Sequence, residues 1–347
     1  MKIIVPISVF LAIFSLLLPF FAAKTPLPSN SPAPTVEVTT AAAVAEPTPS
    51  PTADYNLISS FDSAVSLTLQ TNGEIITIKM SDYLVGVVAA EMPANFYDEA
   101  LKAQAVAVRT FTYYSASGAS ANSVHPDADV CDNPVHCKAW LSDEALREKW
   151  GDNYDVYIAK IKSAVVATDG LCAVYEDKPI LAVFHAASGG FTEDSANVWG
   201  EALPYLRSVQ SPESPASVPD FVTEPAFSLS EFKRLALEVY PDMDLSGASE
   251  TWFGEESRSP NGRLLSVALG GVKLSGTQLR NLFGLRSANA VWTISVSEIR
   301  FTVTGYGHGV GMSQFGANEF ARNGADFKSI LQYYYKGVEI EVISQAL

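Results

Sequence analysis

The residues whose types and positions indicate chemistry in this chain begin at position 91, in the stretch EMPANFYDEALKAQAVAVRT. Glu91 ends a run of apolar residues and stands directly before Met92 and Pro93, which stop a helix. We expect a carboxyl group there to be partly withdrawn from water, which raises its pKa and lets it hold a proton near neutral pH. Arg109 lies in an otherwise apolar segment, so we expect its guanidinium to reach an anionic group or a cleft. The pattern predicts Glu91 as a catalytic acid.

A second pattern follows a predicted strand and suits a sugar ligand. Small residues let a ligand approach the backbone there, and hydroxyl groups and flat aromatic rings come close behind them. A sugar presents hydroxyl edges and an apolar ring face, which this combination of side chains matches. The residues are Ser188, Gly189, Gly190, Thr192, Trp199 and Tyr205. His185 precedes them on the strand, where a histidine bonded within the core is the competing interpretation.

A third pattern is the glycine-rich segment GYGHGVGMSQFG, from Gly305 to Gly316. It places His308 on a turn that enters a helix, for which Ser313 is the expected N-cap. The segment lacks the Gly-Lys-Ser/Thr ending of a phosphate-binding loop. A purely structural role is the alternative for His308.

Four residues of one loop could hold a metal ion. His125, Cys131, His136 and Cys137 supply imidazoles and thiolates, which are good zinc ligands. The spacing is not that of a standard zinc finger, and in an exported protein a Cys131–Cys137 disulfide is the natural competitor. Three of these residues crowd into seven positions, which favours zinc. With His125 as the fourth ligand the site has no open position for water and would be structural.

Composition excludes some classes of function. The 347-residue chain has a formal net charge of −15, whereas binding to nucleic acid calls for a basic patch. The same charge disfavours adhesion to anionic lipid headgroups. Three cysteines are too few for a fold stapled by disulfides. Cys172, on a predicted strand, is expected to be a buried free thiol.

The N-terminal part of the chain differs in composition from the rest. Residues 3–23 carry no charge and are almost wholly apolar, and about 20 helical residues match a hydrocarbon core about 30 Å thick. The segment is longer than the apolar part of a usual signal peptide, so residues 1–23 are expected to be a membrane anchor rather than a cleaved signal. Residues 24–55, rich in Pro, Ser, Thr and Ala, are expected to form a disordered tether. On either interpretation the bulk of the chain is exported.

Residues 56–347 mix strands and helices without βαβ regularity, which predicts a single α+β domain. Asn72-Gly73 predicts a hairpin turn between strands over 66–70 and 74–79. Ser81 is the expected N-cap of a short helix that ends at Glu91. Further helices are expected over 98–115, 143–150, 156–168, 229–240 and 276–285, and further strands over 172–175, 180–185, 264–269 and 291–303.

Four motifs in this order resemble the stage II sporulation protein D family, which includes the amidase-enhancer modules. The resemblance covers the chain from about residue 58 to its end. The motifs are YLxGVVxxEMP from Tyr83, LKAQAVAVRT from Leu101, SGGxT from Ser188 and GHGVGMSQFG from Gly307.

The resemblance implies a lytic transglycosylase that cuts peptidoglycan glycan strands during engulfment in endospore formers. It implies that Glu91 is the catalytic glutamate and that zinc is bound by the loop with His125, Cys131, His136 and Cys137. The implied cleft residues are Arg109, Ser188, Gly189, Gly190, Thr192, Tyr205, His308 and Gln314. The implied partner is a cell-wall amidase that removes stem peptides. The implied location is the mother-cell membrane, with a single-pass anchor and the catalytic domain on the extracytoplasmic side, facing the forespore.

One carboxyl group suffices for such a reaction, although ordinary glycoside hydrolysis needs two. The 6-hydroxyl of muramic acid attacks its own anomeric carbon, and an intramolecular attack has a high effective molarity. Glu91 would first protonate the leaving oxygen and then take the proton of the 6-hydroxyl, while Arg109 would orient Glu91 or bind the lactyl carboxylate. The alternatives are a non-enzymatic amidase enhancer and a zinc-dependent hydrolase.

Overall fold

The computed structural model describes residues 60–117 and 125–343. The expected anchor (1–23), the whole of the expected tether (24–55) and residues 56–59 of the expected domain lie outside these ranges. In the part of the chain that is described, no helix is long and apolar enough to cross a membrane. The described elements mix helices with small sheets, as the sequence predicts.

The first elements form the predicted hairpin. β1 (Ser66–Thr71) and β2 (Glu74–Lys79) pair in antiparallel fashion. Between them Asn72 and Gly73 have positive φ angles of 50° and 80°. A two-residue turn between twisted strands requires positive φ, and asparagine and glycine tolerate it better than other residues. The Asn-Gly signal therefore predicted both the turn and its place.

The helix that carries Glu91 follows this hairpin without a break. α1 (Met80–Glu91) has Lys79 as its N-cap, so the prediction of Ser81 was wrong by two positions. The helix ends where expected, since Met92 has extended angles of φ −125° and ψ 137°. Met92 precedes Pro93, and a residue before proline is disfavoured in the helical conformation. Glu91 is thereby held at the last turn of a largely buried helix.

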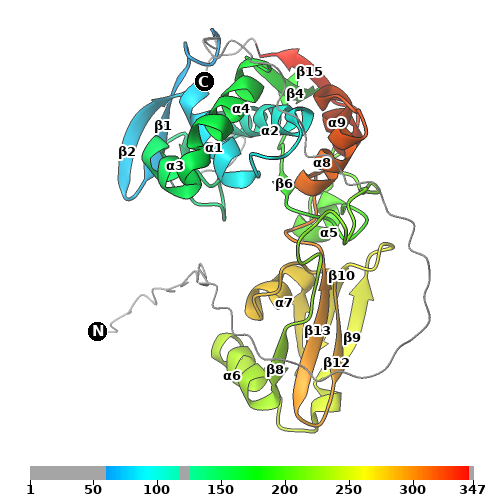
Figure 1. Cartoon of the computed structure of the whole chain (residues 1–347). Coiled ribbons are helices and arrows are strands. Elements are labelled where there is room, and N and C mark those ends of the chain that lie inside the picture. Colours follow the sequence, from blue (N-terminus) through cyan, green and yellow to red (C-terminus); the bar gives the residue numbers. More distant parts are fainter. Residues whose placement is uncertain (1–59, 118–124, 344–347) are drawn as a thin grey trace, which may run out of the picture. The chain divides into compact units, whose positions relative to one another are not determined.

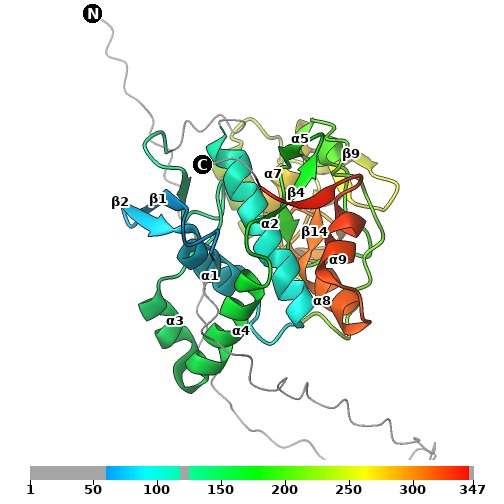
Figure 2. The ribbon, with the colours of Figure 1, turned by 90° about the horizontal axis from the view of Figure 1, so that it is seen from above.

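The long helix α2 (Asp98–Ala116) lies at the centre of the first hydrophobic core, with other helices on several sides (Figure 1, Figure 2). Its many alanine and valine side chains are buried and let neighbouring elements approach closely. The elements in contact with it include α1, α4 (Tyr154–Val166), β4 (Leu171–Tyr175), α8 (Gln314–Arg322) and α9 (Phe327–Tyr334).

Smaller elements complete this core. β3 (Val130–Cys131) adds to β1 in parallel and brings the cysteine–histidine loop against the hairpin. α3 (Asp143–Trp150) has the predicted bounds and leads through a short 3-10 turn, Gly151–Asn153, into α4. β15 (Glu339–Val342) and β5 (Lys178–Pro179) flank β4.

A second hydrophobic core lies within residues 222–304, which we call the sheet module. Aromatic rings fill it, and those of Phe232 and Phe283 stack 4.3 Å apart. The predicted strand over 291–303 is in fact a hairpin, with its turn between Ile294 and Glu298. The elements are β7 (Val222–Thr223), β8 (Ala226–Ser228), α6 (Leu229–Val239), a 3-10 turn (Ser249–Thr251), β9 (Phe253–Arg258), β10 (Leu264–Leu269), β11 (Val272–Ser275), α7 (Gly276–Leu282), β12 (Ala290–Ile294) and β13 (Glu298–Thr304).

Two short strands bring the second and third sequence patterns together. β6 (Phe184–His185) pairs in parallel with β14 (Met312–Ser313), so the Ser-Gly-Gly turn and the glycine-rich segment leave the same two-stranded sheet. The predicted strand over 180–185 is therefore much shorter than expected. α5 (Ser195–Trp199) follows the turn.

Candidate active site

Glu91 is half-buried and lines an open pocket. Its Oε1 accepts a hydrogen bond from the backbone N–H of Ala139, with 3.0 Å between the two atoms. The pocket is lined by Ala90, Glu91, Met92, Pro93, Ala94, Asn95, Lys149, Trp150 and Tyr157. Glu91 is the single carboxyl group among these lining residues. The structure thus holds the predicted acid in place and leaves it a face toward solvent.

Burial raises the pKa of Glu91 above its usual value, as the sequence predicted. The nearby ammonium of Lys138, the hydrogen bond from Ala139 and the ammonium of Lys149 oppose this rise without cancelling it. No carboxylate is among the groups that act on Glu91 in the described structure. The environment therefore favours a protonated carboxyl group, which a general acid needs.

The charge of Lys138 acts both on Glu91 and on His308 of the glycine-rich segment. The side chain is buried, and its ammonium lies 4.1 Å from the ring centroid of Phe111 and 4.3 Å from that of Phe184. Burial lowers the pKa of Lys138 to about 8. The charge of this ammonium acts on Glu91 and also on His308, so both are within its electrostatic reach.

The four predicted metal ligands converge. The ligand atoms of His125, Cys131, His136 and Cys137 all lie within 4.8 Å of one another, and all three cysteines of the described chain are free thiols. His125 Nε2 is 3.0 Å from Cys137 Sγ, and Cys131 Sγ is 3.5 Å from His136 Nδ1. Around a tetrahedral zinc ion, ligand atoms are about 3.3–3.8 Å apart. The donor set therefore fits a zinc ion.

The electrostatics of this cluster also suit a cation. Burial raises the pKa of the Cys137 thiol to about 12 and lowers that of His136. A cation at the centre would stabilise the thiolate, and a neutral imidazole is the form that binds metal. Ala139, the hydrogen-bond donor to Glu91, is only two residues beyond Cys137. An ion bound by these four residues would hold the loop that orients the candidate acid.

The Ser-Gly-Gly turn is mostly internal. Ser188 is 2% exposed, and its hydroxyl donates to Nε2 of His185, 2.9 Å away. His185 in turn donates from Nδ1 to the carbonyl of Val310, and burial lowers its pKa to about 3. A serine beside a histidine is a familiar nucleophile pair, but here neither side chain is accessible. The prediction that Ser188 contacts substrate was therefore wrong, and His185 is the bonded core histidine that the sequence left open.

His308 remains a candidate binding residue. Its Nδ1 accepts a hydrogen bond from the N–H of Val310 at 3.1 Å, which leaves the proton of the neutral ring on Nε2. Burial, together with the charges of His185 and Lys138, lowers the pKa of His308 well below its usual value. The ring lies 5.3 Å from that of Trp199, which is 45% exposed. A neutral N–H donor beside an open aromatic face suits a sugar.

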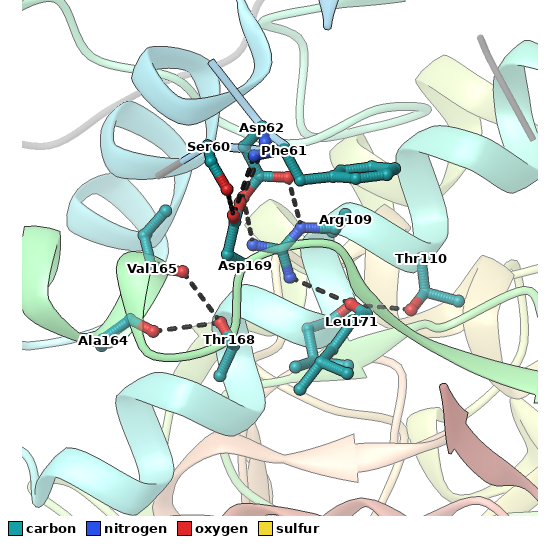
Figure 3. Close-up of polar contacts among 11 residues, drawn as sticks. Ser60, Phe61, Asp62, Arg109, Thr110, Ala164, Val165, Thr168, Asp169 and Leu171 are labelled. Atoms are coloured by element: carbon teal, nitrogen blue, oxygen red, sulfur yellow. Dashed lines mark hydrogen bonds and ion pairs between the residues drawn. The ribbon is translucent and has the colours of Figure 1, made fainter. Parts of the chain in front are cut away.

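Arg109 is not a cleft residue, contrary to the prediction of a substrate contact. Its side chain is fully buried, and Nε and Nη2 bind the two carboxylate oxygens of Asp62 at 2.9 and 2.6 Å (Figure 3). Nη1 donates to the carbonyl of Leu171 at 3.0 Å. The expected anionic partner exists, but it is a residue of the protein. Arg109 therefore ties the start of the described chain to the strand β4.

The remaining predicted cleft residues have mixed outcomes. Thr192 bonds to the backbone of Val209, and Tyr205 accepts from the N–H of Leu181; both are buried, so neither can bind substrate as predicted. A Cβ at Gly189 would lie 2.1 Å from Asn289 Nδ2, so a larger residue there would displace the end of the Asn289 side chain. Gly190 has a φ of 97° and open space around it. Gln314 is buried, and its role stays a prediction.

Comparison with known proteins identifies the family of this chain. A family model described as "Stage II sporulation protein" matches residues 69–175. Stage II sporulation protein D of Bacillus amyloliquefaciens is 37% identical over 272 residues, which are 78% of this chain and 76% of that protein. The chain belongs to the stage II sporulation protein D family. The relative of the same name from Bacillus subtilis is 36% identical over 269 residues, with the same shares covered.

Membership in the stage II sporulation protein D family makes this a sporulation protein, as the four motifs predicted. The amidase enhancer of Bacillus subtilis is a more distant relative, 26% identical over 304 residues that are 74% of this chain and 40% of that protein. The family model covers Glu91 and the cysteine–histidine loop, whereas His308 and the sheet module lie beyond it.

Sequence reasoning missed several residues of the site. Lys149 and Trp150, at the end of α3, line the pocket of Glu91. Lys138 directly follows a predicted metal ligand, and this adjacency was the one local signal that could have found it. Arg263 and Arg280, in the sheet module, act on His308 through their charges. No local pattern marks these two arginines, because only the fold brings them to the glycine-rich segment.

Proposed function

We propose that this protein is a lytic transglycosylase that cleaves the bond between N-acetylmuramic acid and N-acetylglucosamine in denuded peptidoglycan strands. The products would carry 1,6-anhydro ends. The observation that carries the proposal is Glu91, a carboxyl group with a raised pKa that stands alone in an open pocket. A glycosidase that uses water or a covalent intermediate needs a second carboxylate within about 5–9.5 Å of the first.

The reaction needs only one proton carrier. Protonated Glu91 gives its proton to the glycosidic oxygen as the bond to the anomeric carbon breaks. The 6-hydroxyl oxygen of the same muramic acid bonds to that carbon, and its proton passes to the Glu91 carboxylate. No water is consumed, and Glu91 returns to its starting state. The hydrogen bond from Ala139 keeps the carboxyl group in one orientation through both transfers.

Zinc would be bound by His125, Cys131, His136 and Cys137, where it would supply structural order rather than a reactive water. All four donors are protein side chains, so a tetrahedral ion has no open position. Its effect on catalysis would pass through the loop to Ala139, and from Ala139 to Glu91.

The proposed setting is the mother-cell membrane, with residues 1–23 as the anchor and the catalytic domain on the extracytoplasmic side. The names of the relatives support a role in sporulation, and the membrane location is a proposal that rests on the sequence alone. The amidase-enhancer relative supports association with a cell-wall amidase, which would deliver denuded strands.

The test is mass spectrometry of denuded strands incubated with wild type and Glu91→Gln. Glutamine still accepts the hydrogen bond from Ala139 but carries no proton to transfer. The matched control is Glu148→Gln, an exposed glutamate on α3. We expect anhydro-ended products from wild type and the control, and none from Glu91→Gln.

Other products would favour the rival functions. Reducing ends would reject the lytic mechanism in favour of hydrolysis, and a zinc-dependent hydrolase would also tolerate Glu91→Gln with its zinc retained. Intact strands in every sample would favour a non-enzymatic enhancer, to which the amidase-enhancer relative points.

A further inference from the structure

One wall of the Glu91 pocket takes no part in the proposed proton transfers. It comes from the end of α3 and from α4, where Lys149, Trp150 and Tyr157 line the pocket. The pocket has a volume of about 420 Å³, and ligand sites typically measure about 300–1,000 Å³. Trp150 and Tyr157 are half-buried, so each keeps part of its ring uncovered. The candidate acid therefore shares a cavity with two aromatic side chains.

The end of α3 fixes the place of Trp150, the last residue of that helix. Gly151 follows with a φ of 51° and a ψ of −125°, and its N–H donates to the carbonyl of Arg147. Positive φ favours glycine, because a residue without a Cβ adopts it at no steric cost. Gly151 thus ends the helix and turns the chain directly after the tryptophan.

Lys149 ties this end of α3 to the end of α1. Its Nζ donates a hydrogen bond to the backbone carbonyl of Ala89 at 2.9 Å. The last carbonyls of a helix have no partner within the helix and carry partial negative charge, so they favour a cation. Ala89 precedes Glu91 by two residues. The bond therefore holds the end of α3, with Trp150, beside the candidate acid.

The two aromatic rings are held by the protein before any ligand binds. Trp150 and Tyr157 meet edge to face, with 5.6 Å between the ring centroids and 77° between the ring planes. Both side chains also pack against the first hydrophobic core. Rigid aromatic side chains lose little conformational freedom on binding, so their contact surface costs little entropy.

The polar atoms of the two rings are available to a ligand. In the described parts of the chain, neither the indole N–H of Trp150 nor the hydroxyl of Tyr157 forms a hydrogen bond, and neither atom is buried. By contrast, the hydroxyl of Tyr154, three residues earlier on α4, donates to Asp143. The wall thus offers flat apolar surface together with two unused donors.

An N-acetylated sugar matches this combination. The C–H groups on the face of a pyranose ring are apolar and pack on an aromatic ring, while its oxygen atoms accept hydrogen bonds at the rim. The acetamido group adds a carbonyl acceptor and an apolar methyl group. In the proposed reaction Glu91 reaches the oxygen that joins two such sugars, so one of them must occupy the cavity beside the acid.

We propose that Trp150 and Tyr157 form the subsite that holds an N-acetylated sugar of the glycan next to the bond that Glu91 cleaves. This inference rests on the proposed function and assigns its substrate contacts to the end of α3 and to α4. The two side chains bind and position the sugar, and neither transfers a proton.

The test is isothermal titration of a tetramer of N-acetylglucosamine, whose binding reports contacts to sugar rings and acetamido groups alone. Full-length protein in detergent carries Glu91→Gln to prevent turnover. Trp150→Leu should weaken binding roughly 10- to 100-fold, because it removes most of the apolar surface that the sugar covers. Trp150→Phe should recover part of this loss. Tyr157→Phe keeps the ring, removes the donor and should weaken binding about 3- to 10-fold.

Two matched variants serve as controls. Trp292→Leu removes a half-buried tryptophan of the sheet module that stacks on Phe253. Tyr154→Phe removes the hydroxyl that bonds to Asp143 and is not part of the pocket lining. Both should bind the tetramer as the parent does.

Several results would overturn the proposal. The first is a parent that does not bind the tetramer, and the second is unchanged affinity in Trp150→Leu. If Trp150→Leu does not fold, Tyr157→Phe decides, and a loss no larger than that of Tyr154→Phe refutes the subsite. Equal losses in Trp150→Leu and Trp292→Leu would refute it as well.

The assays separate this inference from the proposed function. Anhydro-ended products from wild type, with the Trp150 and Tyr157 variants binding as the parent does, would refute the subsite and leave the transglycosylase standing. The expected losses in titration, with no cleavage of denuded strands by wild type, would uphold the subsite and refute the activity.

Discussion

Replacing Arg109 by methionine should destabilise the protein without altering its chemistry. The change leaves Asp62, which is fully buried, without its two charge-assisted hydrogen bonds. Breaking a buried pair from one side costs about 3–5 kcal/mol. A second estimate agrees, because protonating a carboxyl group of ordinary pKa at pH 7 costs about 4 kcal/mol. For a domain of this size we expect the midpoint of thermal unfolding to fall by about 6–20 °C.

The stability lost in Arg109→Met should depend on pH. Burial raises the pKa of Asp62 already in the wild type, although Arg109 opposes this rise, and loss of Arg109 raises the pKa further. The variant therefore loses most stability at neutral pH, and the loss shrinks as the pH falls toward the pKa of Asp62 in the folded wild type, because the wild-type carboxyl group then takes up the same proton.

Unfolding in urea at pH 7 and pH 4.5 measures the loss, and the double variant Asp62→Leu with Arg109→Met serves as the control. Removing both charges should recover most of the stability, as exchange of a buried pair for apolar residues often does. Turnover per folded molecule should stay at the wild-type value in both variants. An Arg109→Met protein of normal stability with a raised KM for glycan would refute this reasoning and restore Arg109 to the substrate.

Two further outcomes are expected at the candidate site. Lys149→Gln removes a positive charge that lowers the pKa of Glu91, so the alkaline limb of kcat/KM should move to higher pH, and a limb that stays or moves down would mean that Glu91 is not the acid. Elemental analysis should find about one zinc per chain in wild type and in Cys172→Ser, whose buried thiol lies outside the cluster. Cys137→Ser should lose the metal and unfold at lower temperature, and equal zinc in both cysteine variants would contradict the site.

Local signals predicted the elements well where neighbouring residues decide the structure. The Asn-Gly turn and the bounds of α3 and β10 were confirmed. The strand expected over 291–303 was wrong because Ser295 makes a turn that its sequence does not reveal. The Ser295 hydroxyl accepts from the N–H of Glu298 at 3.1 Å, which bends an otherwise alternating segment into a hairpin.

The candidate site could be predicted only in its local parts. Glu91 was identified by its place before Met-Pro, and the metal cluster by the crowding of its ligands in one loop. Asp62, the partner of Arg109, lies 47 positions away, and no local pattern in either segment predicts that the two residues pair. The effect of Arg263 and Arg280 on His308 was missed for the same reason, because only the fold brings the sheet module near the glycine-rich segment.

The hydrogen bond to Glu91 comes from the main chain of residue 139, and this has a consequence for how the protein can vary. Nineteen of the twenty common amino acids supply the same N–H, and proline alone lacks it. The hydrogen bond to Glu91 therefore does not depend on which side chain stands at position 139. A substitution to proline would release Glu91, although the position would look unimportant in any comparison of side chains.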